Sequence, residues 1–313
     1  MISCVDFIPA YSELFSYLDS RAGYSEVQKF WDYLFVPDGK GIPLITFLKE
    51  EGITGCWSYW KGSLNEEAAD FTMYLNVKRG FFYNVMHYCP SKGRLLKLAE
   101  TEGFDPYPRY CFHCDYYRKA AEKAGLCYIY NFNGIDHAAC SMLIYDPTVF
   151  DGRVIIDEDT LVMDRKASQN EYFHRDFHSS MNNGIRYLGE NYGEDAIREY
   201  LVRYTEHVLR RVLEDAETRG LDAVEDHIRL TYRKEKAEDA LVMVRNGDTL
   251  HVWTAYCPAV RHLKATNREV TRWFSLTTSV PMKRIAEAAG AEFIMECYDD
   301  ANGAMKYHFT KKQ

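Results

Sequence analysis

The apolar positions of the chain alternate between a helical spacing and a strand-like spacing. Between 178 and 215 they recur every three to four residues, as at Ile197, Leu201 and Val208, which predicts amphipathic helix. The runs "ADFTMYLNV" and "GFFYNVMHYC" alternate apolar and polar residues about a turn at "KRG", a pattern that predicts a β-hairpin. By the same criteria we expect further helices at 10–35, 50–62 and 111–124, a short helix after Cys89-Pro90, and closing hairpins in "LCYIYNFNGIDHAACSMLIYD" and "AEFIMECYDDANGAMKYHF".

This order of elements occurs twice along the chain. Tyr88-Cys89-Pro90 and Tyr256-Cys257-Pro258 are 168 residues apart, and the same offset lays "EEGITG" over "TRGLDA" and "NEEAADFTM" over "RKEKAEDAL". "YLDSRAGYSEV" falls on "YLGENYGEDAI" at an offset of 170, and "AAEKAGLCYIY" falls on "IAEAAGAEFIM" at 165. Matches that keep one order are typical of a duplicated domain. The alternative is a chance agreement between amphipathic helices.

The repeat predicts the fold class and the domain organisation. Helices packed on an antiparallel sheet would make each copy α+β, with the two copies related by an approximate two-fold. We expect the first copy at 1–148 and the second, degenerate copy at 174–313. Residues 149–173 are polar enough for a linker that carries a small hairpin.

Composition narrows the function classes. The 313 residues are 47% hydrophobic and carry a formal net charge of −8, which argues against nucleic acid as the main partner because phosphate binding needs a basic face. No apolar run approaches the length of a membrane span, and the first residues lack a basic leader. We therefore expect a cytoplasmic protein whose nine cysteines are thiols or metal ligands. Its 24 tyrosines suggest an aromatic-lined interior.

Two cysteines stand three residues apart where a proline-rich loop turns into a helix, in "PYPRYCFHC". Cys111 and Cys114 there are compatible with a metal clamp, a redox pair or two semi-buried structural residues. The second copy has Leu276, Ser279 and Met305 where Cys111, Cys114 and Cys140 map, so the lost thiols are best explained by a shared role. Metal binding is the leading interpretation, with zinc favoured and iron as the alternative. The predicted ligands are Cys89, Cys111, Cys114 and Cys140.

Histidines supply the candidate catalytic groups. His178 follows His174 at helical spacing with Asp176 between them, an arrangement that suits two metal ligands, or a general acid or base with an orienting carboxylate. The alternative is a solvated helix start. His113, between the two cysteines, is the third catalytic candidate and is equally compatible with a hydrogen-bonded core residue. An acidic cluster is interpreted as a solvated turn: Glu66, Glu67 and Asp70.

Aromatic and basic residues near the cysteines supply the candidate substrate contacts. Tyr110, Tyr116 and Tyr117 flank the thiols and would stack on a planar heterocycle while donating hydrogen bonds. Lys92 and Arg94 follow Cys89 and would hold a carboxylate, although a solvated helix start explains them equally well.

Several blocks carry a resemblance to known families. "NEEAADFTM", "MHYCPSKGRLL", "PYPRYCFHC", "GIDHAAC" and "YLGENYGEDAIREYL" resemble a bacterial group that is similar to the L-2-amino-thiazoline-4-carboxylate hydrolase-like proteins. The closing pattern, with a glycine and a cysteine between two strands, is similar to that of 4-vinyl reductase domains, which are small-molecule-binding α+β modules. The resemblance implies a ligand role for Cys111 or Cys114 and for Cys140. Ile129 and Phe132 stand where such zinc sites add further ligands, and Cys89 is the substitute.

Two functions follow as expectations. The first is a small-molecule enzyme, hydrolase- or lyase-like on a heterocyclic or amino-acid-like substrate, which uses a thiolate-bound metal. Its substrate would sit between the two copies, near His178 and the Cys111–Cys114 turn. The second is a non-catalytic, sensor-like protein that binds a small molecule and carries a structural zinc. A homodimer is compatible with either function.

Overall fold

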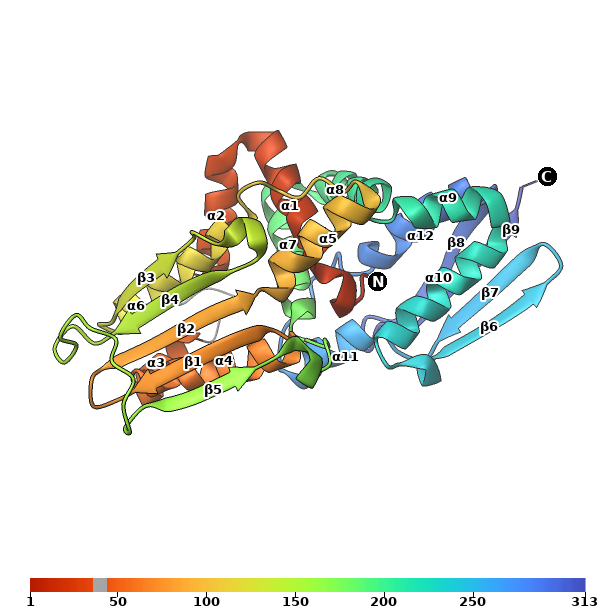
Figure 1. Cartoon of the computed structure of the whole chain (residues 1–313). Coiled ribbons are helices and arrows are strands. Elements are labelled where there is room, and N and C mark those ends of the chain that lie inside the picture. Colours follow the sequence, from red (N-terminus) through yellow and green to blue (C-terminus); the bar gives the residue numbers. More distant parts are fainter. Residues whose placement is uncertain (36–43, 313) are drawn as a thin grey trace. The chain divides into compact units, whose positions relative to one another are not determined.

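The structure, a computed structural model, describes residues 1–35 and 44–312 (Figure 1). The chain divides into two compact units. Unit 1 comprises Met1–Tyr17 and Arg175–Gln313, and unit 2 comprises Leu18–His174. These units differ from the division at 148 and 174 that the sequence suggests. The first seventeen residues group with unit 1, and the expected linker belongs to unit 2.

Unit 2 is an antiparallel sheet with helices along one face. Its strand order is β3-β4-β2-β1-β5, and helices α3, α4 and α6 lie beside the sheet in Figure 1. The strands are β1 (Asp70–Asn76), β2 (Phe81–Tyr88), β3 (Cys127–Asn131), β4 (Cys140–Tyr145) and β5 (Leu161–Arg165). The helices are α2 (Tyr24–Phe35), α3 (Leu44–Glu51), α4 (Thr54–Glu66), α5 (Pro90–Glu102), α6 (Arg118–Lys123) and the 3₁₀ helices η2 (Tyr110–Tyr117), η3 (Ile135–His137) and η4 (Ala167–Gln169).

Unit 1 has the same kind of architecture, so the protein is α+β. The strand order is β6-β7-β9-β8. The strands are β6 (Leu241–Asn246), β7 (Thr249–Thr254), β8 (Ala291–Tyr298) and β9 (Met305–Lys311). The helices are η1 (Cys4–Asp6), α1 (Phe7–Ala22, which continues into unit 2), α7 (Phe177–Tyr192), α8 (Glu194–Val208), α9 (Arg210–Arg219), α10 (Leu221–Lys234), η5 (Glu238–Ala240), α11 (Pro258–Ala265) and α12 (Leu276–Ala288).

The two sheets share one connectivity. When β1, β2, β3 and β4 are matched in chain order with β6, β7, β8 and β9, both sheets have the same neighbours, and all of these pairs are antiparallel. After β2 and after β7 a helix begins at a Cys-Pro step, with Cys89 and Cys257 as the N-caps. The backbone N–H of Cys89 donates to Ala138 O at 2.6 Å, and that of Cys257 donates to Asn302 O at 3.0 Å.

The long helices predicted at 10–35 and 178–215 are each broken by a glycine, and the second is also broken at Leu209, between α8 and α9. Gly23 separates α1 from α2 with φ of 81°, and Gly193 separates α7 from α8 with φ of 82°. Gly52 and Gly220 make the second pair of breaks, with φ of 58° and 60°. Glycine adopts positive φ angles more readily than any other residue, because it has no Cβ. The breaks therefore recur at the offsets that the sequence repeat has.

The residues expected to form a linker hairpin instead supply an edge strand. β5 pairs antiparallel with β1, and Met163 lies opposite Met73. Both methionine side chains are buried in the core of unit 2. The prediction of a separate hairpin was therefore wrong, because β1 has an unpaired edge and an apolar side chain in β5 is covered when it joins that edge.

The segment predicted as a helix over 111–124 begins as the 3₁₀ helix η2 and continues as α6. A 3₁₀ helix has three residues per turn, so side chains three apart lie in one row. Tyr110, His113 and Tyr116 form one row, and the rings of His113 and Tyr116 pack against Trp31 of α2. Cys111, Cys114 and Tyr117 form the next row. The helix type thus decides which site candidates share a face.

Each unit has its own core between sheet and helices. The core of unit 2 contains Trp60, Phe71 and Phe82 among its large side chains, while that of unit 1 contains Leu250, Val252 and Phe309. Among the described residues, no helix is both long enough and apolar enough to cross a membrane.

Candidate functional site

The four predicted metal ligands are gathered in one region of unit 2. Cys89 caps α5 directly after β2, and Cys140 begins β4 opposite Met86 of β2. Cys111 and Cys114 come from η2. All four side chains are partly exposed, and their thiols are close enough to influence one another electrostatically. The sheet and two helix starts therefore bring together cysteines that are up to 51 positions apart.

Tyrosines of β3 hold this region in place. The hydroxyl of Tyr130 donates to Cys140 Sγ at 3.0 Å, and the hydroxyl of Tyr128 donates to Cys114 O at 2.8 Å. On the helical side, the hydroxyls of Tyr59 and Tyr117 lie 3.3 Å apart. Tyrosine hydroxyls and thiols thus form a polar region beside an otherwise apolar core.

The thiols in this region are protonated at neutral pH. Burial raises the pKa of Cys111 and of Cys114 to about 12, and it raises the pKa of Cys140 to about 11. Burial also raises the pKa of Cys89 well above its ordinary value. A nucleophilic cysteine needs the opposite shift, because the thiolate is the reactive form.

The thiols supply the right donor chemistry for zinc, but their atoms are not at the separations that one ion requires. Among the described residues, two groups have three donor atoms within 4.8 Å of one another: Cys4, His178 and Glu235, and His251, Glu296 and His308. A tetrahedral thiolate site needs sulfurs 2.3 Å from the metal, so these four side chains would have to rotate to bind one ion. Zinc at Cys89, Cys111, Cys114 and Cys140 stays a prediction.

His113 is a neutral residue packed between two elements. Its Nδ1 hydrogen-bonds Tyr110 O, and its Nε2 lies 3.6 Å from Cys114 Sγ. Burial lowers the pKa of His113 to about 4. The ring therefore carries no charge at neutral pH, and both of its nitrogens have partners. Its catalytic role stays a prediction.

The predicted substrate contacts fall into two groups. Tyr117 belongs to the row of the thiols, whereas Tyr110 and Tyr116 belong to the row that faces α2. Arg94 stacks on the ring of Tyr172 at 3.5 Å, and the ammonium of Lys92 is a positive charge close to Cys111. Lys92 and Tyr117 are thus the predicted contacts that lie beside the thiols.

Glu67 belongs to this region, although sequence reasoning placed it in a solvated turn. The residue follows α4 and is half-buried. Its carboxylate accepts a hydrogen bond from Ser91 at 3.5 Å. Burial raises the pKa of Glu67 more than the charge of His174 lowers it. The signal for this residue was present in the repeat, because Glu67 maps onto Glu235.

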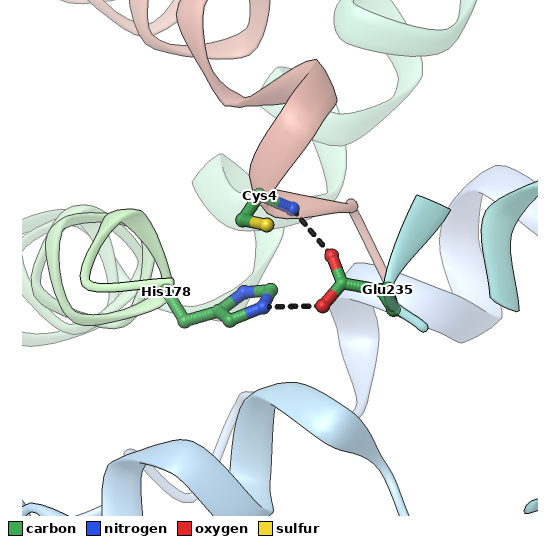
Figure 2. Close-up of side chains that lie close together, drawn as sticks. All are labelled: Cys4, His178 and Glu235. Carbon is green, nitrogen blue, oxygen red and sulfur yellow. Dashed lines mark hydrogen bonds and ion pairs between the residues drawn. The ribbon is translucent and has the colours of Figure 1, made fainter. Parts of the chain in front are cut away.

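A second polar cluster lies inside unit 1 (Figure 2). Glu235, the residue after α10, accepts a hydrogen bond from the backbone N–H of Cys4 at 2.6 Å through Oε1. Its Oε2 lies 2.9 Å from His178 Nε2. The exposed fractions are 0% for Cys4, 2% for His178 and 5% for Glu235, so solvent does not reach this cluster.

The partner of His178 is Glu235 rather than Asp176, which had been expected to orient it. Asp176 ends the loop before α7, and its carboxylate lies 3.2 Å from Arg268 and 3.5 Å from His262. His178 lies within α7 and points into the core. His174, the other histidine of the pair, belongs to unit 2 and contacts Glu66 at 2.7 Å. Helical spacing alone does not bring the two histidines together.

The thiol of Cys4 is not activated as a nucleophile. Burial and the nearby carboxylate of Glu235 raise the pKa of the Cys4 thiol far above its ordinary value. Burial raises the pKa of Glu235, but His178 and the hydrogen bonds from Cys4 outweigh it, so the net shift is downward. Glu235 is therefore an ionised carboxylate that ties the segment before α1 to α7 and to the end of α10.

The two units differ in what fills the equivalent core positions. Asn84 of β2 lies between Met73 and Met142 on the neighbouring strands, and Val252 of β7 holds the same place in unit 1. Asn84 is 4% exposed. Within the described chain, its Oδ1 accepts no hydrogen bond. At an offset of 165, further residues with thiol or hydroxyl groups in unit 2 correspond to residues without them in unit 1. The corresponding pairs are Cys111 and Leu276, Tyr117 and Met282, Tyr128 and Phe293, Tyr130 and Met295, and Cys140 and Met305.

No protein-family model matches this chain, and no curated protein or solved structure matches it either.

Proposed function

We propose that unit 2 binds a small planar ligand, heterocyclic or amino-acid-like, among the polar side chains at the thiol end of its core. The observation that carries this proposal is the exchange of polar for apolar residues between equivalent positions, as at Asn84 and Val252. A buried polar atom without a partner costs about 1–3 kcal/mol. Unit 1 has an apolar residue at this position in the same strand order, so the fold does not require the polar one.

The comparison between units rests on a common origin. We infer that the two units descend from one duplicated domain of the 4-vinyl-reductase-like type. This inference is supported by the shared strand order and by glycine breaks at matching offsets. Ala68 and Lys236, which are 168 residues apart, also share the rare positive φ, with values of 49° and 53°. The approximate two-fold relation between the copies stays a prediction.

The side chains in this region specify the chemistry of the ligand. Asn84 Oδ1 needs an N–H or O–H donor, because it accepts no hydrogen bond within the described chain. The rings of Tyr130 and Phe132 pack against each other with centroids 4.4 Å apart and an angle of 41° between their planes, and such aromatic rows favour a planar ring. Lys92, close to Cys111, favours a ligand that also carries a carboxylate.

Binding without turnover is favoured over catalysis. Burial raises the pKa of the thiols and lowers that of His113, so neither a thiolate nor a charged imidazole is ready for acid–base work. The second candidate is a hydrolase- or lyase-like enzyme with a thiolate-bound zinc or iron. The gathering of four cysteines favours this candidate. Elemental analysis of the purified chain tests it: one zinc or iron per chain, lost in Cys111→Ser, is its expected result.

The binding proposal is tested by giving unit 2 the residues of unit 1. Thermal unfolding is followed with a panel of five- and six-membered heterocyclic carboxylates, using wild type, Asn84→Val and Tyr130→Met. We expect Asn84→Val to raise the free energy of unfolding by about 1 kcal/mol, because an unpaired amide is removed. We expect the same variant to lose the stabilisation that a bound panel member gives the wild type.

A control variant separates binding from general loss of tyrosine. Tyr83→Met changes the other face of β2, where Tyr83 stacks on Tyr74, and it should keep the ligand response. The proposal is refuted if no panel member stabilises the wild type, or if Asn84→Val and wild type respond equally.

A further inference from the structure

Apart from the cluster of Cys4, His178 and Glu235, unit 1 has a group of side chains that can bind a metal on its sheet, on the face away from its core. His251 of β7 and His308 of β9 are directly paired across two antiparallel strands. Glu296 comes from β8, where the register shifts between Met295 and Cys297. The donor atoms of His251, Glu296 and His308 all lie within 4.8 Å of one another.

The alternation of the strands explains why these side chains share a face. Leu250, Val252, Tyr307 and Phe309 are buried in the core. Their neighbours His251 and His308 therefore point to the opposite side of the sheet. A β-bulge re-aims the side chain at the extra residue, and the shift in β8 lets Glu296 reach across to β9. His308 Nδ1 lies 2.7 Å from Glu296 Oε1.

Neighbouring side chains fix the rings and leave one face open. His251 stacks on Trp253 with ring centroids 5.7 Å apart and an angle of 19°. The side chains of His308 and Glu296 are 21% and 28% exposed. Solvent therefore reaches the cluster, and a bound ion would keep positions for water.

We propose that His251, His308 and Glu296 form a solvent-facing site for a divalent transition-metal ion. Two imidazoles and one carboxylate are donors that suit Ni²⁺, Cu²⁺ and Zn²⁺, whereas Mg²⁺ and Ca²⁺ prefer oxygen donors alone. Three protein ligands leave the remaining positions of the ion to water. This site is independent of the ligand proposed for unit 2.

The ammonium group of Lys306 competes with a metal ion for the carboxylate of Glu296. Its ammonium lies 2.7 Å from Glu296 Oε2, so a metal must share the carboxylate with a positive charge. Lys306→Ala should therefore tighten metal binding, because it removes this repulsion and frees Oε2. A structural ion pair alone would give no such gain.

The site is tested by titrating Ni²⁺ into the full chain after chelator treatment, with isothermal calorimetry and tryptophan fluorescence as readouts. We expect one site, with quenching that is lost in Trp253→Phe while the heat of binding remains. His251→Ala and Glu296→Gln should each weaken binding at least about tenfold. Glu296→Gln keeps the shape of the side chain, so it serves if His251→Ala does not fold.

Two controls assign the ion to this cluster. His137→Ala removes an exposed histidine of unit 2 and should leave the affinity unchanged. The double variant Cys111→Ser with Cys114→Ser should also bind Ni²⁺ as the wild type does. The proposal is overturned if the wild type binds no Ni²⁺, if Glu296→Gln binds with unchanged affinity, or if the cysteine variant loses the ion.

Discussion

Glu67 and Glu235 hold the same position in the two units. Each is the first residue after a helix, and their φ and ψ angles are −83° and 0° for Glu67 and −86° and −3° for Glu235. Their surroundings nevertheless move their pKa values in opposite directions, upward for Glu67 and downward for Glu235. At this shared backbone position, the surroundings in unit 1 therefore stabilise the ionised form of Glu235, whereas those in unit 2 disfavour the ionised form of Glu67.

This difference predicts opposite effects of the same substitution. Glu235→Gln should lower the free energy of unfolding by about 2 kcal/mol, because hydrogen bonds to a charged carboxylate contribute about 1.5–3 kcal/mol. Glu67→Gln should leave stability unchanged or raise it by less than about 1 kcal/mol. Urea denaturation of the two variants beside wild type measures both. Equal losses in the two variants would contradict the assignment.

The same two groups predict how stability depends on pH. The pKa of Glu235 is lowered in the folded protein, so its contribution is present above its ordinary value of 4.5 and is lost as pH falls through the folded pKa. The pKa of Glu67 is raised, so its contribution is present below 4.5 and is lost as pH rises through the folded pKa. Urea midpoints between pH 3.5 and 7 should fall less steeply towards acid in Glu235→Gln than in wild type. A parallel acid limb would contradict this prediction.

Thiol reactivity follows from the raised pKa values. In chelator-treated protein at pH 7.5, the exposed Cys297 should react with iodoacetamide first. Cys111 and Cys114, whose pKa burial raises to about 12, should react about a thousandfold more slowly than a free thiol, because the thiolate fraction is smaller by that factor. Peptide mass spectrometry against time gives the rates. Rapid labelling of Cys111 would show that this thiol is activated, and it would favour the hydrolase- or lyase-like function over binding alone.

The glycine between α7 and α8 tests the origin of the helix breaks. Gly193 has φ of 82° and ψ of 177°, a region that only glycine occupies readily, and a methyl group there would meet no atom within 4 Å. Gly193→Ala should therefore cost about 1–3 kcal/mol through backbone strain alone. Gly62→Ala, at an exposed position inside α4 with equally open space, should instead raise stability by about 0.5–1 kcal/mol. Urea denaturation of both variants measures the two effects.

Several features followed from the sequence because local rules govern them. Alternating and helical spacings predicted the hairpin of β1 and β2 and the helices of both copies. The Cys-Pro steps predicted the starts of α5 and α11. Gly23 and Gly193 lie inside segments that were predicted as continuous helices. Both glycines are local signals for the breaks that the structure has there. The same alignment paired Glu67 with Glu235, although the interpretation of Glu67 as part of a solvated turn did not use that pairing.

The site geometry depended on contacts that no local pattern contains. Glu235 meets His178 across 57 residues and Cys4 across 231, and the pairing of His251 with His308 requires the register of β7 and β9. The 3₁₀ form of η2 decided that Cys111, Cys114 and Tyr117 share a row, while His113 belongs to another.

By itself, the sequence determined the α+β class and the twofold occurrence of one element order, and it placed Leu276, Ser279 and Met305 at the positions that correspond to Cys111, Cys114 and Cys140. Spacing and turn chemistry act over a few residues, so a single chain reveals them. The tertiary structure decided that β5 joins β1, that the first residues belong to unit 1 and that Glu235 replaces Asp176 beside His178. Those outcomes depend on which segments, far apart in the sequence, pack against one another. Hydrophobic burial is non-directional, so the spacing of apolar residues does not specify which segments will pack together.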